Sequence, residues 1–146
     1  MRVTLLLADF AQVAEGKLSL LGAGWTFKAI NAPMAVGVIV EVPWDETNKP
    51  HHWVLRLVSE DGQPVLLPSP FGDPQPILLE GQIEVGRPPG YPVGVPFNVP
   101  MAVNFGPAPL APAERFMFVF EVDGQPAESG QVAFSTAPSP PGLPPQ

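Results

Sequence analysis

The sequence contains no cysteine and only two histidines, the neighbours His51 and His52. The lack of cysteine excludes a disulfide framework, a thiolate nucleophile and a cysteine-ligated zinc site. Successive residues of a strand point to opposite faces, so the two imidazoles are not expected to share one metal. We interpret both as polar rings near solvent at the entrance of a strand, and a surface transition-metal site is the alternative.

Basic residues are scarce: seven Lys and Arg stand against fourteen Asp and Glu, which gives a net charge of −7. So few cations form no basic patch, and this argues against nucleic acid or an anionic membrane surface as a partner. Long hydrophobic runs are also missing. The first run, Val3–Ala8, is shorter than the apolar region of a signal peptide, and no stretch approaches the ~20 apolar residues of a transmembrane helix. We therefore expect a cytoplasmic protein.

Helical periodicity is absent, and alternation with a period of two takes its place. It is clearest near the end of the chain, where Phe116, Phe118, Phe120 and Val122 occupy every second position. Asp123-Gly124 follows and supplies the two residues of a tight hairpin turn, and the return limb carries Val132 and Phe134. We expect this hairpin to contribute one buried face to the core.

Further alternating segments predict about eight to ten short strands with turn signals between them. These segments are Val3–Ala8, Leu18–Ile30, Val36–Val42, Trp53–Val58, Val65–Leu67, Ile77–Val85 and Phe97–Phe105. The second changes phase at Gly22-Ala23-Gly24, which predicts a bulge or bend there. Pro100 lacks an N–H, so its strand is expected at a sheet edge or locally broken.

Proline is unusually abundant, with 22 residues against a typical ~5%. Because the prolines lie between alternating apolar segments, they predict stiff loops at 68–76 and 86–96 rather than general disorder. Residues 137–146 carry five prolines and are predicted to form a flexible or polyproline tail. The predicted fold is one all-β domain over residues 1–136, a two-sheet antiparallel β-sandwich of immunoglobulin-like or Greek-key type. A partly open β-barrel is the alternative.

Several short stretches resemble a family of small bacterial proteins catalogued as a domain of unknown function. The stretches are Leu5–Val13 (LLLADFAQV), Gly16–Leu18 (GKL), Leu21–Trp25 (LGAGW), Glu84–Gly90 (EVGRPPG) and Val103–Pro107 (VNFGP). Together they extend over most of residues 3–135. The resemblance implies a bacterial source and a compact β-domain, and it assigns no catalytic residue, ligand or partner.

Oxygen-bearing side chains gather at the turn that follows residue 40, where Glu41, Asp45, Glu46 and Asn48 lie close in sequence. Such oxygens suit Ca²⁺, although their spacing does not match an EF-hand loop. We interpret them as a solvated turn, with a weak calcium site as the alternative. No other metal or cofactor is expected.

Two aromatic residues lie in loops beside proline, namely Trp44 and Tyr91, and Arg87 lies in the second of these loops. Loop aromatics can stack on sugars or dock a partner, so these three residues are candidate binding residues; capping the ends of the core is the alternative reading. No Gly-x-Ser-x-Gly nucleophile motif occurs, so a hydrolase would need an active site scattered through the sequence.

These observations favour a non-enzymatic protein that acts through protein–protein interaction, as an accessory or structural subunit of a larger assembly. The alternative is a module that binds carbohydrate or calcium. Apolar residues also occupy the outward positions of several strands: Leu6, Ala8, Ala35, Ile39, Val54, Val58, Met117 and Val119. We therefore expect self-association or a protein partner, unless the proline-rich loops cover this outer face.

Overall fold

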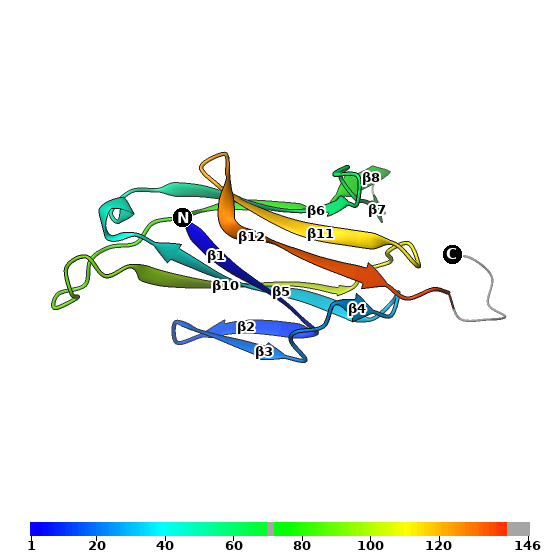
Figure 1. Ribbon diagram of the computed structural model, residues 1–146, viewed down its shortest axis with the longest axis horizontal. Coiled ribbons are helices and arrows are strands. Elements are labelled where there is room, and N and C mark those ends of the chain that lie inside the picture. Colours follow the sequence, from blue (N-terminus) through cyan, green and yellow to red (C-terminus); the bar gives the residue numbers. More distant parts are fainter. Residues whose placement is uncertain (70–71, 140–146) are drawn as a thin grey trace.

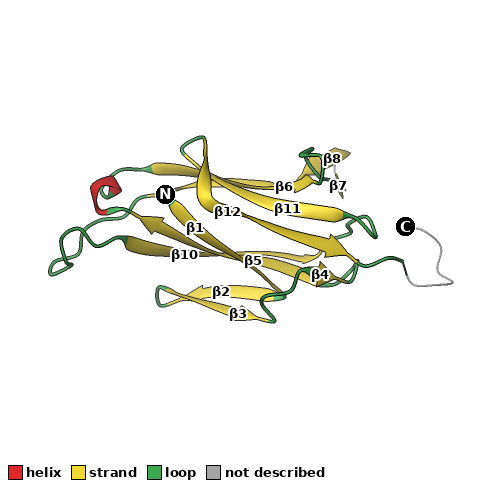
Figure 2. Cartoon of the chain, viewed as in Figure 1, coloured by secondary structure: helices red, strands yellow, loops and turns green. Residues whose placement is uncertain are grey.

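Strands make up nearly all the regular structure in the computed structural model, which describes residues 1–69 and 72–139 (Figure 1). They are β1 (Arg2–Ala8), β2 (Phe10–Ala14), β3 (Lys17–Leu21), β4 (Phe27–Lys28), β5 (Pro33–Val42), β6 (His51–Ser59), β7 (Leu66–Ser69), β8 (Gly72–Pro76), β9 (Leu78–Ile83), β10 (Phe97–Pro107), β11 (Arg115–Val122) and β12 (Gln125–Thr136). A single 3₁₀ turn, η1 (Trp44–Glu46), is the one helical element in this part of the chain (Figure 2). Among these residues, no helix has the length and apolar character needed to cross a bilayer. The all-β prediction is confirmed.

Eight strands form one continuous sheet in the order β10-β5-β1-β12-β11-β6-β9, with β4 pairing with β12 outside this path. β12 joins the two halves, because Glu128 pairs with Arg2 in parallel while Arg115–Val119 of β11 pair with the later residues of β12. The sheet therefore curls over on itself into a half-barrel, with β6 and β11 in one layer and β5 and β10 in the other (Figure 1). This corrects the prediction of two separate sheets: the layers face each other as in a sandwich, but one strand belongs to both, which is closer to the partly open barrel.

The core lies between these two layers and is formed by the alternating residues that the sequence indicated. It includes Val3, Leu5 and Leu7 of β1, Val36, Val38, Val40 and Val42 of β5, Leu55 and Leu57 of β6, Phe116, Phe118 and Phe120 of β11, and Phe134 of β12. Phe118 is fully buried and lies between Phe105 and Phe134, at centroid distances of 5.4 and 5.9 Å. Each such side chain contributes about 1.5–3 kcal/mol through burial alone.

The β11–β12 hairpin forms as predicted. Its turn residues Asp123 and Gly124 have φ values of 52° and 78°, which is the left-handed pair that a tight two-residue turn requires. The register shifts between Val119 and Glu121, where β12 carries extra residues opposite β11. Glu128, the residue that pairs with β1, lies within this bulge.

The β2–β3 hairpin packs on the outer face of the sheet over β5 and β10, beneath the lower layer in Figure 1. Gly37 of β5 makes room for it, because a Cβ there would lie 2.7 Å from Leu20 Cδ2. The Asn104 side chain fastens it to β10: the Asn104 amide accepts from Ala11 N at 3.0 Å and donates to Ala11 O at 2.7 Å. This hairpin, rather than a proline-rich loop, covers part of the outer face, while Leu6 remains 41% exposed.

Four local predictions need correction or limits. The segment 68–76, predicted as a loop, contains most of the β7–β8 hairpin. The segment 18–30 is not one strand, because the chain bends at Gly22–Gly24 and separates β3 from β4, as the bend predicted there allows. After the Asp61-Gly62 turn, the return limb meets β6 through the isolated bridge Val58↔Pro64 and a hydrogen bond from Val65 N to Leu57 O, and its last residues belong to β7. Of the predicted tail, residues 140–146 lie outside the described residues.

Candidate functional site

The two ends of the curled sheet, β9 and β10, are its edge strands, and they are not hydrogen-bonded to each other. Following the pairings around the sheet makes them antiparallel, and they are consecutive along the main path of the chain. A closed barrel would pair them as a hairpin. Pro100 explains part of the gap, since it has no N–H to offer a neighbour, and its predicted edge position in β10 is confirmed.

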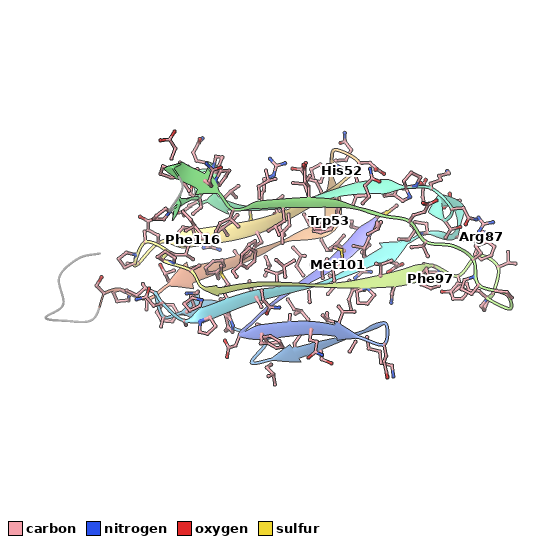
Figure 3. All side chains as sticks on the ribbon, turned by 180° about the vertical axis from the view of Figure 1, so that it is seen from behind. His52, Trp53, Arg87, Phe97, Met101 and Phe116 are labelled. Atoms are coloured by element: carbon pink, nitrogen blue, oxygen red, sulfur yellow. The ribbon has the colours of Figure 1, made fainter. Side chains whose placement is uncertain are left out.

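A groove of about 850 Å³ lies between these two edges, at the end where the loop 86–96 connects them. Its lining comes from the end of β9 and the loop (Gln82, Ile83, Glu84, Val85, Gly86, Arg87, Pro88), the start of β10 (Phe97, Asn98, Val99, Pro100) and Gly16. Figure 3 shows the edge from behind, with Trp53 and Met101 between the two strands and Arg87 and Phe97 at the loop end. Most of the lining residues are apolar and a few are polar, which is the usual make-up of a binding site.

The loop 86–96 forms the end wall of this groove, and two of the predicted binding residues stiffen it. The Tyr91 ring packs on Phe97 at 5.0 Å between centroids, and Tyr91 Oη donates to Pro96 O at 2.6 Å. The Arg87 guanidinium lies over the Trp44 ring at 4.1 Å and donates to Trp44 O at 2.8 Å and to Thr47 Oγ1 at 2.6 Å. The structure therefore brings Arg87 and Trp44 together, but the guanidinium and the indole ring bind each other.

The four predicted oxygen ligands do not converge on one point. Glu41 and Asp45 border a shallow hollow near Pro96. The Glu46 carboxylate instead turns to Lys49 and His51, at 3.9 and 3.7 Å, and Asn48 donates its backbone N–H to Val85 O at 2.7 Å. In the described residues, no group of three or more His, Asp or Glu side chains could hold a metal ion.

His51 corrects the prediction that both histidines lie near solvent. Its ring is only 4% exposed, whereas His52 is exposed and faces Glu80 at 3.4 Å, so the predicted opposite facing of the two is confirmed. His51 Nδ1 lies 2.7 Å from Asp123 Oδ2, and Nε2 lies 2.8 Å from Glu46 O. The sequence carried a signal for this burial, because His51 is in phase with Trp53, Leu55 and Leu57 on the inner face of β6.

The groove itself was missed by sequence reasoning, because it depends on which strands end the sheet. Two signals pointed toward it: a proline inside an alternating strand, and a proline-rich loop too stiff to close a hairpin between β9 and β10.

Comparison with known proteins adds one finding about the whole chain. No curated protein and no solved structure matches it. One family model matches residues 3–133, which is nearly the entire described domain and agrees with the resemblance noted in the sequence. The chain therefore belongs to the family of unknown function DUF6941.

Proposed function

We propose that the chain is a non-enzymatic protein-binding module that takes up an extended segment of a partner protein in the groove between β9 and β10. One observation carries this proposal: two antiparallel strand edges face the same apolar groove and neither pairs with the other. On this view the domain is a sandwich-like half-barrel whose open side is its working surface.

An extended segment suits such a groove for two reasons. Strand edges carry backbone N–H and C=O groups that a partner strand can pair with, which supplies affinity independent of sequence. The apolar lining, including Ile83, Phe97 and Val99, can hold every second side chain of that segment. Strand addition of this kind combines backbone pairing with side-chain pockets.

The charges around the groove indicate which kind of partner segment would bind there. Glu84, which follows β9, lines the groove, and Glu80 lies on the exposed side of β9. Among the described lining residues, Arg87 is the one cation. The Arg87 guanidinium is already held by Trp44 and Thr47. The rim is therefore acidic, and we expect the partner segment to combine alternating apolar residues with flanking Lys or Arg.

The second function considered from the sequence, binding of carbohydrate or calcium, has weaker support. Tyr91 packs on Phe97, and Arg87 covers one face of the Trp44 ring, so each ring already has a partner on one side. Glu46 and Asn48 are not among the described residues that border the hollow beside Glu41 and Asp45. No observation gives either ligand an advantage over a peptide segment.

The test uses a displayed library of short random peptides selected on the immobilised full chain. Pro100 has no N–H for β5, so its nitrogen faces the free edge of β10, and backbone alternation places the N–H of Asn98 at the same edge. Asn98→Pro therefore removes one edge donor and leaves the ladder to β5 intact. We expect this variant to bind the selected peptides with an affinity lower by about tenfold or more, because one backbone carbonyl of the peptide is left unpaired.

Asn98→Ala is the matched control, since it changes the same side chain and keeps the N–H, and we expect it to bind like the original chain. The selected peptides should carry alternating apolar residues with basic flanks. Failure to enrich any peptide, or equal binding by the proline and alanine variants, would refute strand pairing at this edge.

A further inference from the structure

His51 is held between two hydrogen-bond acceptors. Asp123 Oδ2 lies 2.7 Å from Nδ1 and Glu46 O lies 2.8 Å from Nε2, on opposite sides of a ring that is 4% exposed. A carboxylate and a carbonyl cannot donate, so both ring nitrogens must carry a proton to satisfy both contacts. The geometry therefore requires an imidazolium, because a neutral ring would set a nitrogen lone pair against one of the acceptors.

The charges around this ring favour the same form. Asp123 comes from the β11–β12 turn, and it also accepts from the backbone N–H of His52 at 3.0 Å. The Glu46 carboxylate comes from η1, 3.7 Å from Nε2, and is shared with Lys49 at 3.9 Å. His52 is the remaining titratable neighbour, and it faces Glu80 of β9. Two carboxylates therefore face the His51 ring, and the nearest cation, Lys49, is bound to one of them.

The pKa of His51 reflects these opposing effects. Burial of the imidazole lowers its pKa, but the hydrogen bonds to Asp123 and Glu46 O and the charges of both carboxylates outweigh burial and raise it above its usual value. The same hydrogen bond, together with the N–H of His52, lowers the pKa of Asp123.

The His51 contacts continue directly into the wall of the groove. Glu46 ends the η1 turn, and the next residues, Thr47 and Asn48, hold two groove residues. Thr47 Oγ1 accepts from Arg87 Nε at 2.6 Å, and Asn48 N donates to Val85 O at 2.7 Å. Val85 and Arg87 both line the groove, so the ring that fixes the turn also fixes this wall.

We propose that His51 is a proton-operated latch: its imidazolium ties the η1 turn to the β11–β12 hairpin, and loss of its proton releases the turn and the Val85–Arg87 wall of the groove. The consequence for peptide binding rests on the function proposed above. The latch itself does not, because it concerns contacts within the free chain.

The direction of the pH effect follows from the linkage between protonation and stability. A histidine whose folded pKa exceeds its unfolded value of about 6.5 contributes its stabilisation fully below that value. The contribution is lost as the pH rises through the folded pKa. The latch is therefore closed in mildly acidic solution and opens on the alkaline side of about pH 6.5.

The experiment follows the free chain by NMR across this pH range. Nitrogen shifts of the two imidazoles report their protonation, and the exchange protection of the Asn48 amide reports the turn. We expect Asn48 protection to be lost as His51 loses its proton, because the neutral ring can no longer donate to both Asp123 and Glu46 O. His51→Gln should show low protection at every pH, without a transition.

His52→Gln is the matched control, because it removes the exposed neighbouring imidazole and should leave the Asn48 profile unchanged. Asp123→Asn keeps a residue that tolerates positive φ in the turn, and it should move the His51 transition to lower pH. This variant decides the question even if His51→Gln fails to fold.

A neutral His51 ring throughout the range, or an Asn48 profile that Asp123→Asn does not shift, would overturn the latch. Neither readout involves a peptide, so failure of the latch and failure of strand addition are separate results. If both proposals hold, the selected peptides should bind more weakly above the His51 transition than below it.

Discussion

Single residues in this chain act largely through partners far away in sequence. Phe118 packs against Phe105 and Phe134, and Asn104 bonds to Ala11 across 93 positions. His51 meets Asp123 across 72 positions. Which face of a strand a residue occupies was readable from alternation, because that is a local property. Which distant residue it meets was not: the phase of His51 along its strand indicated the inner face, but nothing local indicated Asp123 as its partner.

The cost of removing a core ring follows from burial. We expect Phe118→Ala to lower the free energy of unfolding by about 3–5 kcal/mol, because the ring is fully buried between two others. Met117→Ala, on the outer face and only partly buried, should cost less. Denaturant unfolding of both variants measures the difference. Equal losses would mean that the outer face of β11 is covered as completely as the core side.

Elements were predictable where their signals were local. The β11–β12 turn followed from Asp123-Gly124, and both residues take positive φ. The β7–β8 hairpin was missed, because its strands contain prolines at 68, 74 and 76 that normally break a ladder. The position of the β2–β3 hairpin on the sheet could not be predicted either. It depends on Gly37, which has no side chain to block the hairpin, and on the hydrogen bonds of Asn104.

The β2–β3 hairpin should therefore detach when Asn104 loses its amide. Asn104→Ala leaves both the N–H and the C=O of Ala11 without their partner, which costs about 1–3 kcal/mol for each buried group. Hydrogen exchange at the Ala11 amide should become faster by tenfold or more, while the amides of β11 keep their protection. Asn98→Ala, which changes an exposed asparagine of the same strand, should leave Ala11 unaffected. Unchanged exchange in Asn104→Ala would assign the anchoring to Leu18 and Leu20 instead.

The whole molecule is an all-β domain, as its composition and alternation indicated, but its strand order was not readable from the sequence. Alternation gives the faces of each strand and says nothing about which strand lies beside which. This limit affected the candidate site most, because a groove between two edge strands can be located only when the strand order is known. Candidate residues chosen by type, such as Trp44, Arg87 and Tyr91, proved to support the end of the groove.

An open edge also bears on association of whole molecules. Pro100 interrupts the free edge of β10, and we expect Pro100→Thr to promote pairing between chains, because it restores an N–H at that edge. Light scattering at micromolar concentration should show a higher apparent mass for Pro100→Thr than for the original chain. Pro92→Thr, which changes an exposed proline in the loop, is the control and should show no increase. An unchanged mass for Pro100→Thr would mean that the edge is protected by something other than this proline.

The junction of β1 with β12 has a consequence for how the chain is made. The first strand of the fold and the last one meet where Arg2 pairs with Glu128 and where Glu128 N donates to Met1 O at 3.1 Å. During synthesis β1 emerges from the ribosome more than a hundred residues before its neighbour exists. Contacts between such distant segments slow folding, so β1, β5 and β10 stay separate from the other half of the sheet until β12 has been synthesised.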